Sequence, residues 1–355
     1  MQNILKQVQW DKFKIEDLFS VTIGQNIDGN KVDKSTGKTP YITRKESNNG
    51  LDGFINASQS MLNISFPVIT IGNETAEPFV QTYNFFTGTK VNILIPKVAL
   101  SKYVLLFICN AIKMHKSKYS YSYSINSTRL KKQTILLPIN KDSVPDYEFM
   151  EQYMVKLESK KISSYKMYIS ERKTELFANE KIASLNEKVW NEFKIGALFN
   201  IKAGKSKGLN HLKRNENGIS YLGATNNNNG VLALVEQVEN MVQKGNCIAF
   251  IRNGEGSMGY SIYKKEDFIA TSDITVGYNE NLNPYVGMFI TTVADKVRGK
   301  YNFGYKRSDG RLKKETLQLP VNEKGEPDYK YMEQYIKQIE IDLLTKYLTF
   351  INNRK

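Results

Sequence analysis

The chain has 355 residues, of which 41% are hydrophobic, so it is long enough for two domains and too apolar for a disordered chain. Its 50 Lys and Arg outnumber its 36 Asp and Glu, and the resulting net charge of +14 favours a polyanionic partner such as nucleic acid. A basic surface without a specific partner is the alternative interpretation.

The cysteine content and the N-terminal sequence narrow the cellular setting. Only Cys109 and Cys247 are present, so no disulfide framework is expected and a reducing cytoplasm is indicated. No apolar segment follows the opening MQNILKQVQW, so we expect no signal peptide. No apolar run reaches the length of a membrane span, and we expect no membrane partner.

The chain contains an internal duplication. WDKFKIEDLFSVTIG at 10–24 matches WNEFKIGALFNIKAG at 190–204, at an offset of 180. RLKKQTILLPINKDSVPDYEFMEQY at 129–153 matches RLKKETLQLPVNEKGEPDYKYMEQY at 311–335, with 15 of 25 positions identical at an offset of 182. The period is about half the chain, which excludes a solenoid and predicts a tandem pair of similar units.

Each copy has the same predicted layout. Short apolar runs separated by Gly and Asn turns come first, at 21–32, 39–55 and 66–73 in the first copy, and they predict strands. A stretch of helical character follows, at 102–114 and at 284–296. After it come a basic, aromatic loop, a strand that begins with Arg-Leu-Lys-Lys and ends in Leu-Pro, and finally a long helix.

The stretch 142–187 contains no Gly and a single Pro, at its front edge, and it predicts a long helix over 146–187. Apolar residues recur at steps of three and four, and Asp146 is suited to be the N-cap. The second copy predicts a shorter helix at 328–352. The apolar stripes of the two helices are natural partners, because a long amphipathic helix must bury its stripe. The stripe residues expected to pair are Met150, Tyr153, Leu157, Met332, Tyr335 and Ile339.

The loops at 113–132 and 296–314 are the strongest candidates for contact with nucleic acid. Both interleave Lys and Arg with Tyr or Phe, a combination that neutralises phosphates and reaches base edges. A solvated charged turn is the alternative for each loop, and structural anchoring is the alternative for Arg129 and Arg311. The predicted contacts are Lys118, Tyr121, Tyr123, Arg129, Arg298, Lys300, Tyr305, Arg307 and Arg311.

Further Gly-, Asn- and Lys-rich loops supply weaker candidates, for which an ordinary turn is an equally good interpretation. These candidates are Arg44, Lys205, Lys207, Arg252 and Asn253.

No catalytic or metal-ligating pattern is found in the sequence. The two histidines do not occupy matching positions, no Cys/His cluster has metal-ligand spacing, and no Gly-rich cofactor loop follows a strand. Asp146, Glu158 and Lys160 mimic a nuclease signature, but they lie on a predicted helix and are better interpreted as a cap and solvated positions. We therefore expect no catalytic residue, no metal and no cofactor.

The duplicated layout resembles the DNA-specificity (S) subunit of type I restriction–modification systems and its relatives among bifunctional type II systems. The resemblance rests on WDKFKIEDLF and WNEFKIGALF, on KYSYSY and KYNFGY, and on RLKK…LP…PDYxxMEQY. It implies an α+β fold with two target-recognition domains, each a small twisted β-sheet plus short helices, separated by two long antiparallel coiled-coil helices. The implied segments are 1–145 for the first domain, 146–187 for the central helix, 188–327 for the second domain and 328–355 for the C-terminal helix.

The resemblance also implies a function and partners. Each domain would read one half of a split site in double-stranded DNA, and the helices would set the spacing between the halves. Two DNA methyltransferase subunits and a restriction subunit would dock on the chain, which would not itself be catalytic. A stand-alone tandem nucleic-acid-binding regulator and a fused nuclease or methyltransferase are the alternatives.

Overall fold

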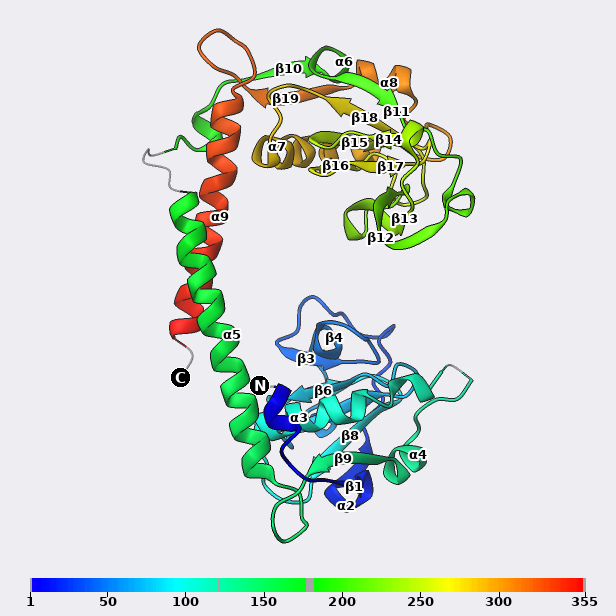
Figure 1. Cartoon of the computed structure of the whole chain (residues 1–355), viewed down its shortest axis with the longest axis vertical. Helices are drawn as coiled ribbons and strands as arrows, with labels where there is room; N and C mark the ends of the chain where they lie inside the picture. Colours follow the sequence, from blue (N-terminus) through cyan, green and yellow to red (C-terminus); the bar gives the residue numbers. More distant parts are fainter. Residues whose placement is uncertain (1, 121, 177–181, 354–355) are drawn as a thin grey trace. The chain divides into compact units, whose positions relative to one another are not determined.

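The computed structural model describes residues 2–120, 122–176 and 182–353, and the chain divides into two compact units. Unit 1 comprises Met1–Tyr165 and unit 2 comprises Lys166–Lys355. Each unit combines small β-sheets, mostly antiparallel, with short helices, and the sequence predicts this mixture of strands and helices (Figure 1).

Unit 1 is built from three small sheets. Its main sheet has the order β2-β8-β5-β6, a second sheet has the order β4-β3-β7, and β1 pairs with β9. Its elements are α1 (Gln2–Leu5), β1 (Trp10–Lys14), α2 (Ile15–Leu18), β2 (Phe19–Ile23), β3 (Thr39–Ile42), β4 (Leu51–Ile55), β5 (Val68–Gly72), β6 (Pro78–Gln81), β7 (Phe86–Thr87), β8 (Val91–Pro96), α3 (Lys102–Lys113), α4 (Ser127–Lys132), β9 (Thr134–Pro138) and the start of α5 (Tyr147–Glu175).

Unit 2 repeats this plan with a larger second sheet. Its sheets have the orders β11-β18-β15-β16, β13-β12-β17-β14 and β10-β19. Its elements are β10 (Trp190–Lys194), α6 (Ile195–Leu198), β11 (Asn200–Ala203), β12 (Arg214–Leu222), β13 (Val231–Val235), β14 (Val242–Gln243), β15 (Cys247–Ile251), β16 (Ser261–Lys264), β17 (Phe268–Ala270), β18 (Ile274–Tyr278), α7 (Pro284–Ala294), α8 (Asp309–Lys314), β19 (Thr316–Pro320) and α9 (Tyr329–Asn352).

One helix in each unit supports the main sheet, and both were predicted. α3 begins at its N-cap Ser101 and buries Leu105 and Ile108 against the strands of unit 1. α7 begins with Pro284 after the cap Asn283, whose side chain accepts hydrogen bonds from two backbone amides. These helices fix the position of the basic loop that follows each of them.

The RLKK segments are helical, which corrects the strand predicted for them. Asn126 caps α4 and Ser308 caps α8, each by accepting a hydrogen bond from the amide of the arginine three residues later. The leucine of each segment is buried and its lysines face solvent, and a strand begins only afterwards, at Thr134 or Thr316. The capping side chains favour a helical turn before the strand.

The long helices begin as predicted, but the first one is shorter than expected. Asp146 accepts a hydrogen bond from the amide of Phe149 at 2.9 Å, and Asp328 accepts one from Tyr331 at 3.0 Å. α5 ends at Glu175, whereas the sequence predicts a helix to residue 187. A separate turn at Leu185–Glu187 starts at its own cap, Ser184.

The structure corrects the predicted helix-pairing stripe, because the most buried residues of the stripe pack into the domain cores. Met150 and Tyr153 pack into the core of unit 1, and Met332 and Tyr335 pack into the core of unit 2. Ile339 is exposed and Leu157 is half-buried. The first turns of each helix lie against their own domain, because they follow directly from a strand of that domain and must cover its core.

Contact between the two long helices occurs within unit 2, over the last residues of α5. Ile169 and Leu176 form a small buried cluster with Leu344 of α9. The Arg172 guanidinium donates to Glu340 at 2.7 Å, and Lys166 donates to Asn352 at 2.7 Å. Residues with higher numbers on α5 contact residues with lower numbers on α9, so the two segments run antiparallel.

No helix within the described residues combines the length and the apolar character that crossing a membrane requires.

Candidate nucleic-acid interface

A stack of two tyrosines and one arginine organises the basic loop of unit 2. The Tyr301 and Tyr305 rings stack with centroids 6.1 Å apart, and the Arg311 guanidinium carbon lies 3.9 Å from the Tyr305 centroid. Arg311 Nη1 also donates to the carbonyl of Lys306 at 2.7 Å. The guanidinium therefore closes the loop through a cation–π contact and a hydrogen bond.

The same stack recurs in unit 1. The Tyr119 and Tyr123 rings stack at 6.1 Å, Arg129 lies 4.0 Å from the Tyr123 centroid, and its Nη1 donates to the carbonyl of Ser124 at 2.7 Å. Arg129 and Arg311 therefore anchor their loops, the alternative that the sequence left open. Their contact with nucleic acid stays a prediction, as does that of Tyr123 and Tyr305, which are half-exposed.

The first tyrosine of each stack is hydrogen-bonded to the residue that ends the following short helix, just before the next strand begins. The Tyr119 hydroxyl donates to Gln133 at 2.6 Å, and the Tyr301 hydroxyl donates to Glu315 at 2.5 Å. Burial raises the pKa of Tyr119, and burial together with the Glu315 carboxylate raises the pKa of Tyr301. Both hydroxyls therefore remain protonated donors.

Arg307 is wrongly predicted as a DNA contact, because its side chain is 0% exposed. Its Nη2 and Nε donate to the two carboxylate oxygens of Glu315, at 2.5 and 3.0 Å, and its Nη1 donates to the carbonyl of Gly259 at 3.1 Å. The guanidinium carbon lies 5.2 Å from the Phe250 ring centroid. Arg307 is the internal support of the loop.

Unit 1 has uncharged side chains at the two positions that the Arg307–Glu315 ion pair occupies in unit 2. At the offset of 182, Ile125 replaces Arg307 and Gln133 replaces Glu315. Ile125 is buried in the apolar core, and the Nε2 atom of Gln133 is buried without a partner. The two positions change together between the copies, as expected for side chains in direct contact.

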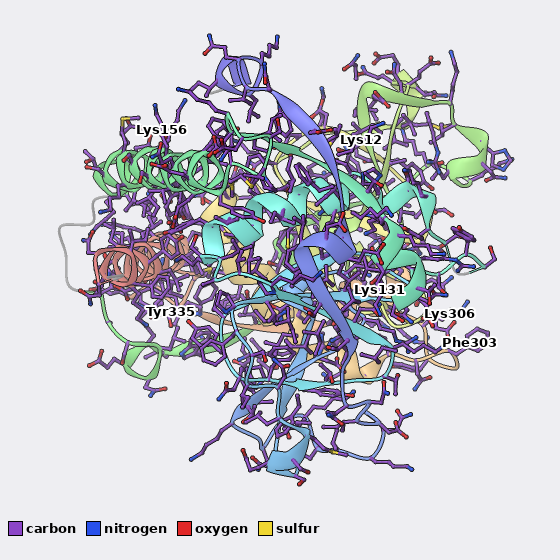
Figure 2. The ribbon with its side chains drawn as sticks, turned by 90° about the horizontal axis from the view of Figure 1, so that it is seen from below. Lys12, Lys131, Lys156, Phe303, Lys306 and Tyr335 are labelled. Carbon is purple, nitrogen blue, oxygen red and sulfur yellow. The ribbon has the colours of Figure 1, made fainter. Side chains whose placement is uncertain are left out.

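Exposed lysines cover the outside of both loops. Lys118, Lys300 and Arg298 are exposed, and their contact with DNA stays a prediction. The Arg298 guanidinium carbon lies 4.7 Å from the Tyr260 ring centroid. Tyr121 lies outside the described residues. The predicted contacts leave out several other exposed residues of these loops, which belong to the repeated RLKK and to the KYNFGYKR segment: Lys131, Lys132, Phe303, Lys306, Lys313 and Lys314. Figure 2 labels three of them, Lys131, Phe303 and Lys306.

The weaker candidates mostly have partners within the protein. Arg44 pairs with Glu74 at 2.5 Å, and Arg252 pairs with Asp309 at 3.2 Å. Asn253 donates to Asp273 at 3.1 Å, and Lys205 donates to the carbonyl of Asn240 at 2.8 Å. Lys207 is exposed. The carboxylate partners reduce the charge that Arg44 and Arg252 offer to a phosphate, and the hydrogen bonds occupy donors of Asn253 and Lys205.

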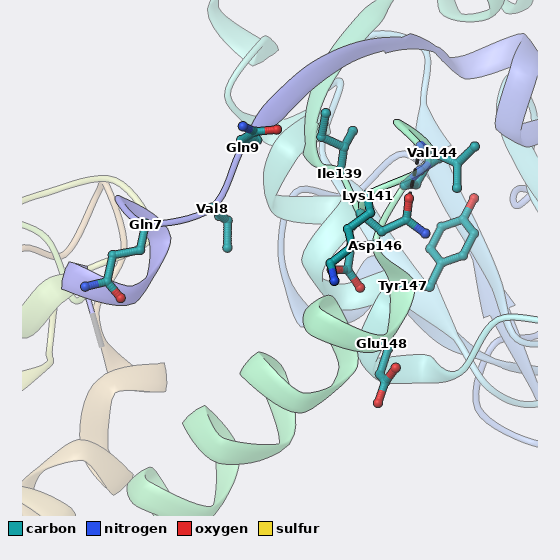
Figure 3. A pocket seen from close by; sticks show the side chains of 11 residues that line it. Gln7, Val8, Gln9, Ile139, Lys141, Val144, Asp146, Tyr147 and Glu148 are labelled. Carbon is teal, nitrogen blue, oxygen red and sulfur yellow. Dashed lines mark hydrogen bonds between the residues drawn. The ribbon is translucent and has the colours of Figure 1, made fainter.

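A hollow of about 800 Å³ lies beside the loop of unit 2. It is lined by the segment from Asn253 to Tyr260 and by the loop residues Arg298, Tyr301 and Phe303. A second hollow, of about 920 Å³, lies in unit 1 where the strand β9 turns into α5, next to Gln7, Lys141 and Asp146 (Figure 3). Neither lining carries a cluster of titratable groups arranged for catalysis.

Covalent and metal chemistry find little support among the described residues. No group of three potential His, Cys, Asp or Glu ligands occurs there. Burial raises the pKa of Cys247 to about 12 and that of Cys109 further, so both thiols stay protonated and are poor nucleophiles. Each unit therefore presents a positively charged loop whose aromatic rings are held in place by internal contacts, an arrangement that is suited to binding.

Comparison with known proteins agrees with this geometry. The type I restriction modification DNA specificity domain matches the chain twice, at residues 7–165 and 187–346. The type II restriction enzyme BgcI specificity subunit S.BcgI of Heyndrickxia coagulans is 37% identical over 343 residues, which cover 96% of each chain.

A solved structure shares the fold over nearly the whole chain. The S subunit of a type I restriction–modification system from M. genitalium superimposes with a TM-score of 0.56 at 16% identity, over 98% of this chain and 94% of that one. The same assignment follows from the two similar loops, from the two matches to the family's domain and from a relative that is similar from end to end. The chain belongs to the family of restriction–modification DNA specificity subunits.

Proposed function

We propose that this chain is the DNA-recognition subunit of a restriction–modification enzyme and that each unit reads one half of a bipartite site. The observation that carries the proposal is the recurrence, in both units, of the Tyr-Tyr-Arg stack with exposed lysines around it. A rigid loop with a positive rim can position side chains at base edges while lysines contact phosphates. The segments 1–145 and 188–327 would hold these recognition surfaces.

The long helices would act as the spacer between the two recognition domains. The antiparallel contact between the end of α5 and α9 supports this role, because hydrogen bonds and a buried apolar cluster join the two segments. Two recognition surfaces on one chain raise each other's effective concentration at DNA. The spacing that the helices set would correspond to the nonspecific segment between the half-sites.

The proposed enzyme needs catalytic partners. We assign methylation to two DNA methyltransferase subunits and cleavage to a restriction subunit that joins through them, while the chain itself is not catalytic. A relative that is 37% identical is the specificity subunit of a type II restriction enzyme, and this supports the division. The cytoplasm, where the enzyme would meet DNA, is the compartment that this function requires.

Reconstitution tests the proposal. The chain is co-expressed with a candidate DNA methyltransferase subunit from the same genome, and DNA methylation is measured with S-adenosylmethionine for each protein alone and for the complex. We expect methylation only by the complex, because recognition and chemistry reside in different subunits. Methylation or cleavage of DNA by the purified chain alone would refute the non-catalytic assignment.

A further inference from the structure

Phe303 is the most exposed large apolar side chain that the described residues contain, with 90% of its surface accessible. Single exposed apolar residues are common and need no explanation by themselves. Phe303 differs because it stands at the tip of the basic loop of unit 2, and because the loop holds it there in a fixed turn.

The turn at Phe303 and Gly304 is closed by three hydrogen bonds. The amide of Tyr305 donates to the carbonyl of Asn302 at 3.0 Å, and the amide of Asn302 donates back at 3.4 Å. The Gly304 amide donates to the side chain of Asn302 at 3.0 Å. Phe303 therefore projects from a two-residue hairpin tip, and the hairpin cannot fold over to cover the ring without breaking these bonds.

The base of this hairpin is fixed to the core of unit 2. Tyr301 and Tyr305 stack on each other, Arg311 closes the stack, and the hydroxyl of Tyr301 donates to Glu315. Glu315 in turn holds the fully buried Arg307. The buried ion pair and the tyrosine stack therefore hold the two residues that flank the tip, Tyr301 and Tyr305, in a defined position.

The surroundings of Phe303 select an anionic partner. Lys306 Nζ lies 5.4 Å from the Phe303 ring centroid, and Lys300 and Arg298 precede the hairpin on the same loop. The hollow of about 800 Å³ begins beside the ring and has the Tyr260 ring, with Arg298 over it, in its lining. An aromatic tip, cations and an adjoining aromatic hollow are suited to an unstacked nucleotide.

The other copy carries an aromatic residue at the same position. At the offset of 182, Phe303 matches Tyr121, which lies outside the described residues. Between KYSYSY and KYNFGY the ring is retained although the neighbouring residues change. The two sequences therefore share an aromatic residue at this aligned position.

We propose that Phe303 is a wedge that inserts at a base step of bound duplex DNA and that the adjoining hollow receives the displaced nucleotide. Apolar side chains inserted between base steps partly unstack them and kink the duplex, and flexible pyrimidine–purine steps yield most easily. The inference rests on the proposed DNA-recognition function and adds to it a residue that reads the deformability of the site. Phe303 would thus contribute to sequence preference without a hydrogen bond to a base.

The test uses the complex of the full chain with its methyltransferase and DNA that carries the site found by methylation mapping. Each adenine in turn is replaced by 2-aminopurine, whose fluorescence rises when the base loses its neighbours. Because a methyltransferase also extrudes its own target base, the wild-type complex should show a several-fold rise at one position besides the methylated adenines, in the half-site that unit 2 reads. Phe303→Ala should abolish the rise at that position and weaken binding by roughly 10-fold, the loss of one stacking contact.

Two further variants separate stacking from charge. Phe303→Tyr, which copies the residue of the first unit, should retain the rise. Lys300→Ala should weaken binding in a salt-dependent manner and leave the rise unchanged once the DNA is saturated.

The outcomes that overturn the inference are distinct. Wild-type binding without a rise beyond the methylated adenines, or a rise at that position that persists in Phe303→Ala, would exclude the wedge and leave the DNA-recognition function standing. Loss of the methyltransferase from the Phe303→Ala complex would instead assign Phe303 to a protein interface. A wild-type complex that fails to bind DNA at all would refute the proposed function and the wedge with it.

Discussion

Replacing Arg307 with isoleucine is expected to lower the free energy of unfolding of unit 2 by about 3–5 kcal/mol. The Arg307 side chain is fully buried and donates to both carboxylate oxygens of Glu315. Its removal leaves a buried carboxylate whose guanidinium partner is gone, and the desolvation of that charge is no longer compensated. The loop that carries Tyr301 and Tyr305 should loosen at the same time.

The chain supplies its own matched control for this prediction. The double variant Arg307→Ile with Glu315→Gln copies the pair that unit 1 uses, Ile125 and Gln133, and removes both charges together. We expect it to recover most of the lost stability, because a neutral glutamine is far less costly to bury than a carboxylate without a partner. A double variant as unstable as the single one would show that volume, rather than charge, decides this site.

The two tryptophans allow the units to be followed separately. Trp190 packs on Phe289 in unit 2, and Trp10 packs on Phe107 in unit 1. Denaturant unfolding of Arg307→Ile is therefore measured by fluorescence in Trp10→Phe and Trp190→Phe backgrounds. The Trp190 signal should report the loss and the Trp10 signal should not, and equal shifts of both signals would contradict a local effect.

Replacing Lys300, Lys313 and Lys314 with alanine is expected to reduce the salt dependence of DNA binding. All three lysines are exposed, on the basic loop and on α8. Each phosphate contact contributes about 0.9 to the slope of log K against log salt, so three lost contacts would reduce the slope by about 2.7. The measurement is a titration of the methyltransferase complex with fluorescent DNA over a range of salt concentrations.

An equal loss of charge on the helix α5 is the control for that experiment. Lys156, Lys160 and Lys161 are exposed on α5, which the proposed function treats as a spacer rather than a DNA contact. Because charges beyond about 10 Å are screened at 0.1 M salt, this triple replacement should leave the slope nearly unchanged. Equal effects of the two triple variants would mean that net charge alone, and no particular surface, binds the DNA.

The parts of the fold that were predictable have local causes. The duplication in the sequence predicts two similar units. Pro145 and Asp146 predict the start of α5, because helix capping depends on residues that are adjacent in the chain. The strand prediction for the RLKK segments is wrong because the helix caps Asn126 and Ser308 lie within loops of basic and aromatic composition, where the capping pattern is hard to recognise.

The site was less predictable, because a sequence does not show which charged residues are paired with each other inside the folded protein. Arg307 sits among lysines in a basic loop, and only the fold brings Glu315 to its guanidinium. A signal was present in the duplication, where Arg307 with Glu315 alternates with Ile125 and Gln133. Likewise Met150 and Met332 fit a helix-pairing stripe by spacing alone, but each is buried in the core of its own domain.

The measurement that tests the central claim most directly is a map of DNA methylation by the reconstituted complex at single-base resolution. Two recognition domains on one chain predict a site with two specified halves and an unspecified segment of fixed length between them. Phe303→Ala, a change in unit 2, should then relax the sequence preference of one half only. A single uninterrupted site, or a preference altered in both halves by that change, would contradict the account.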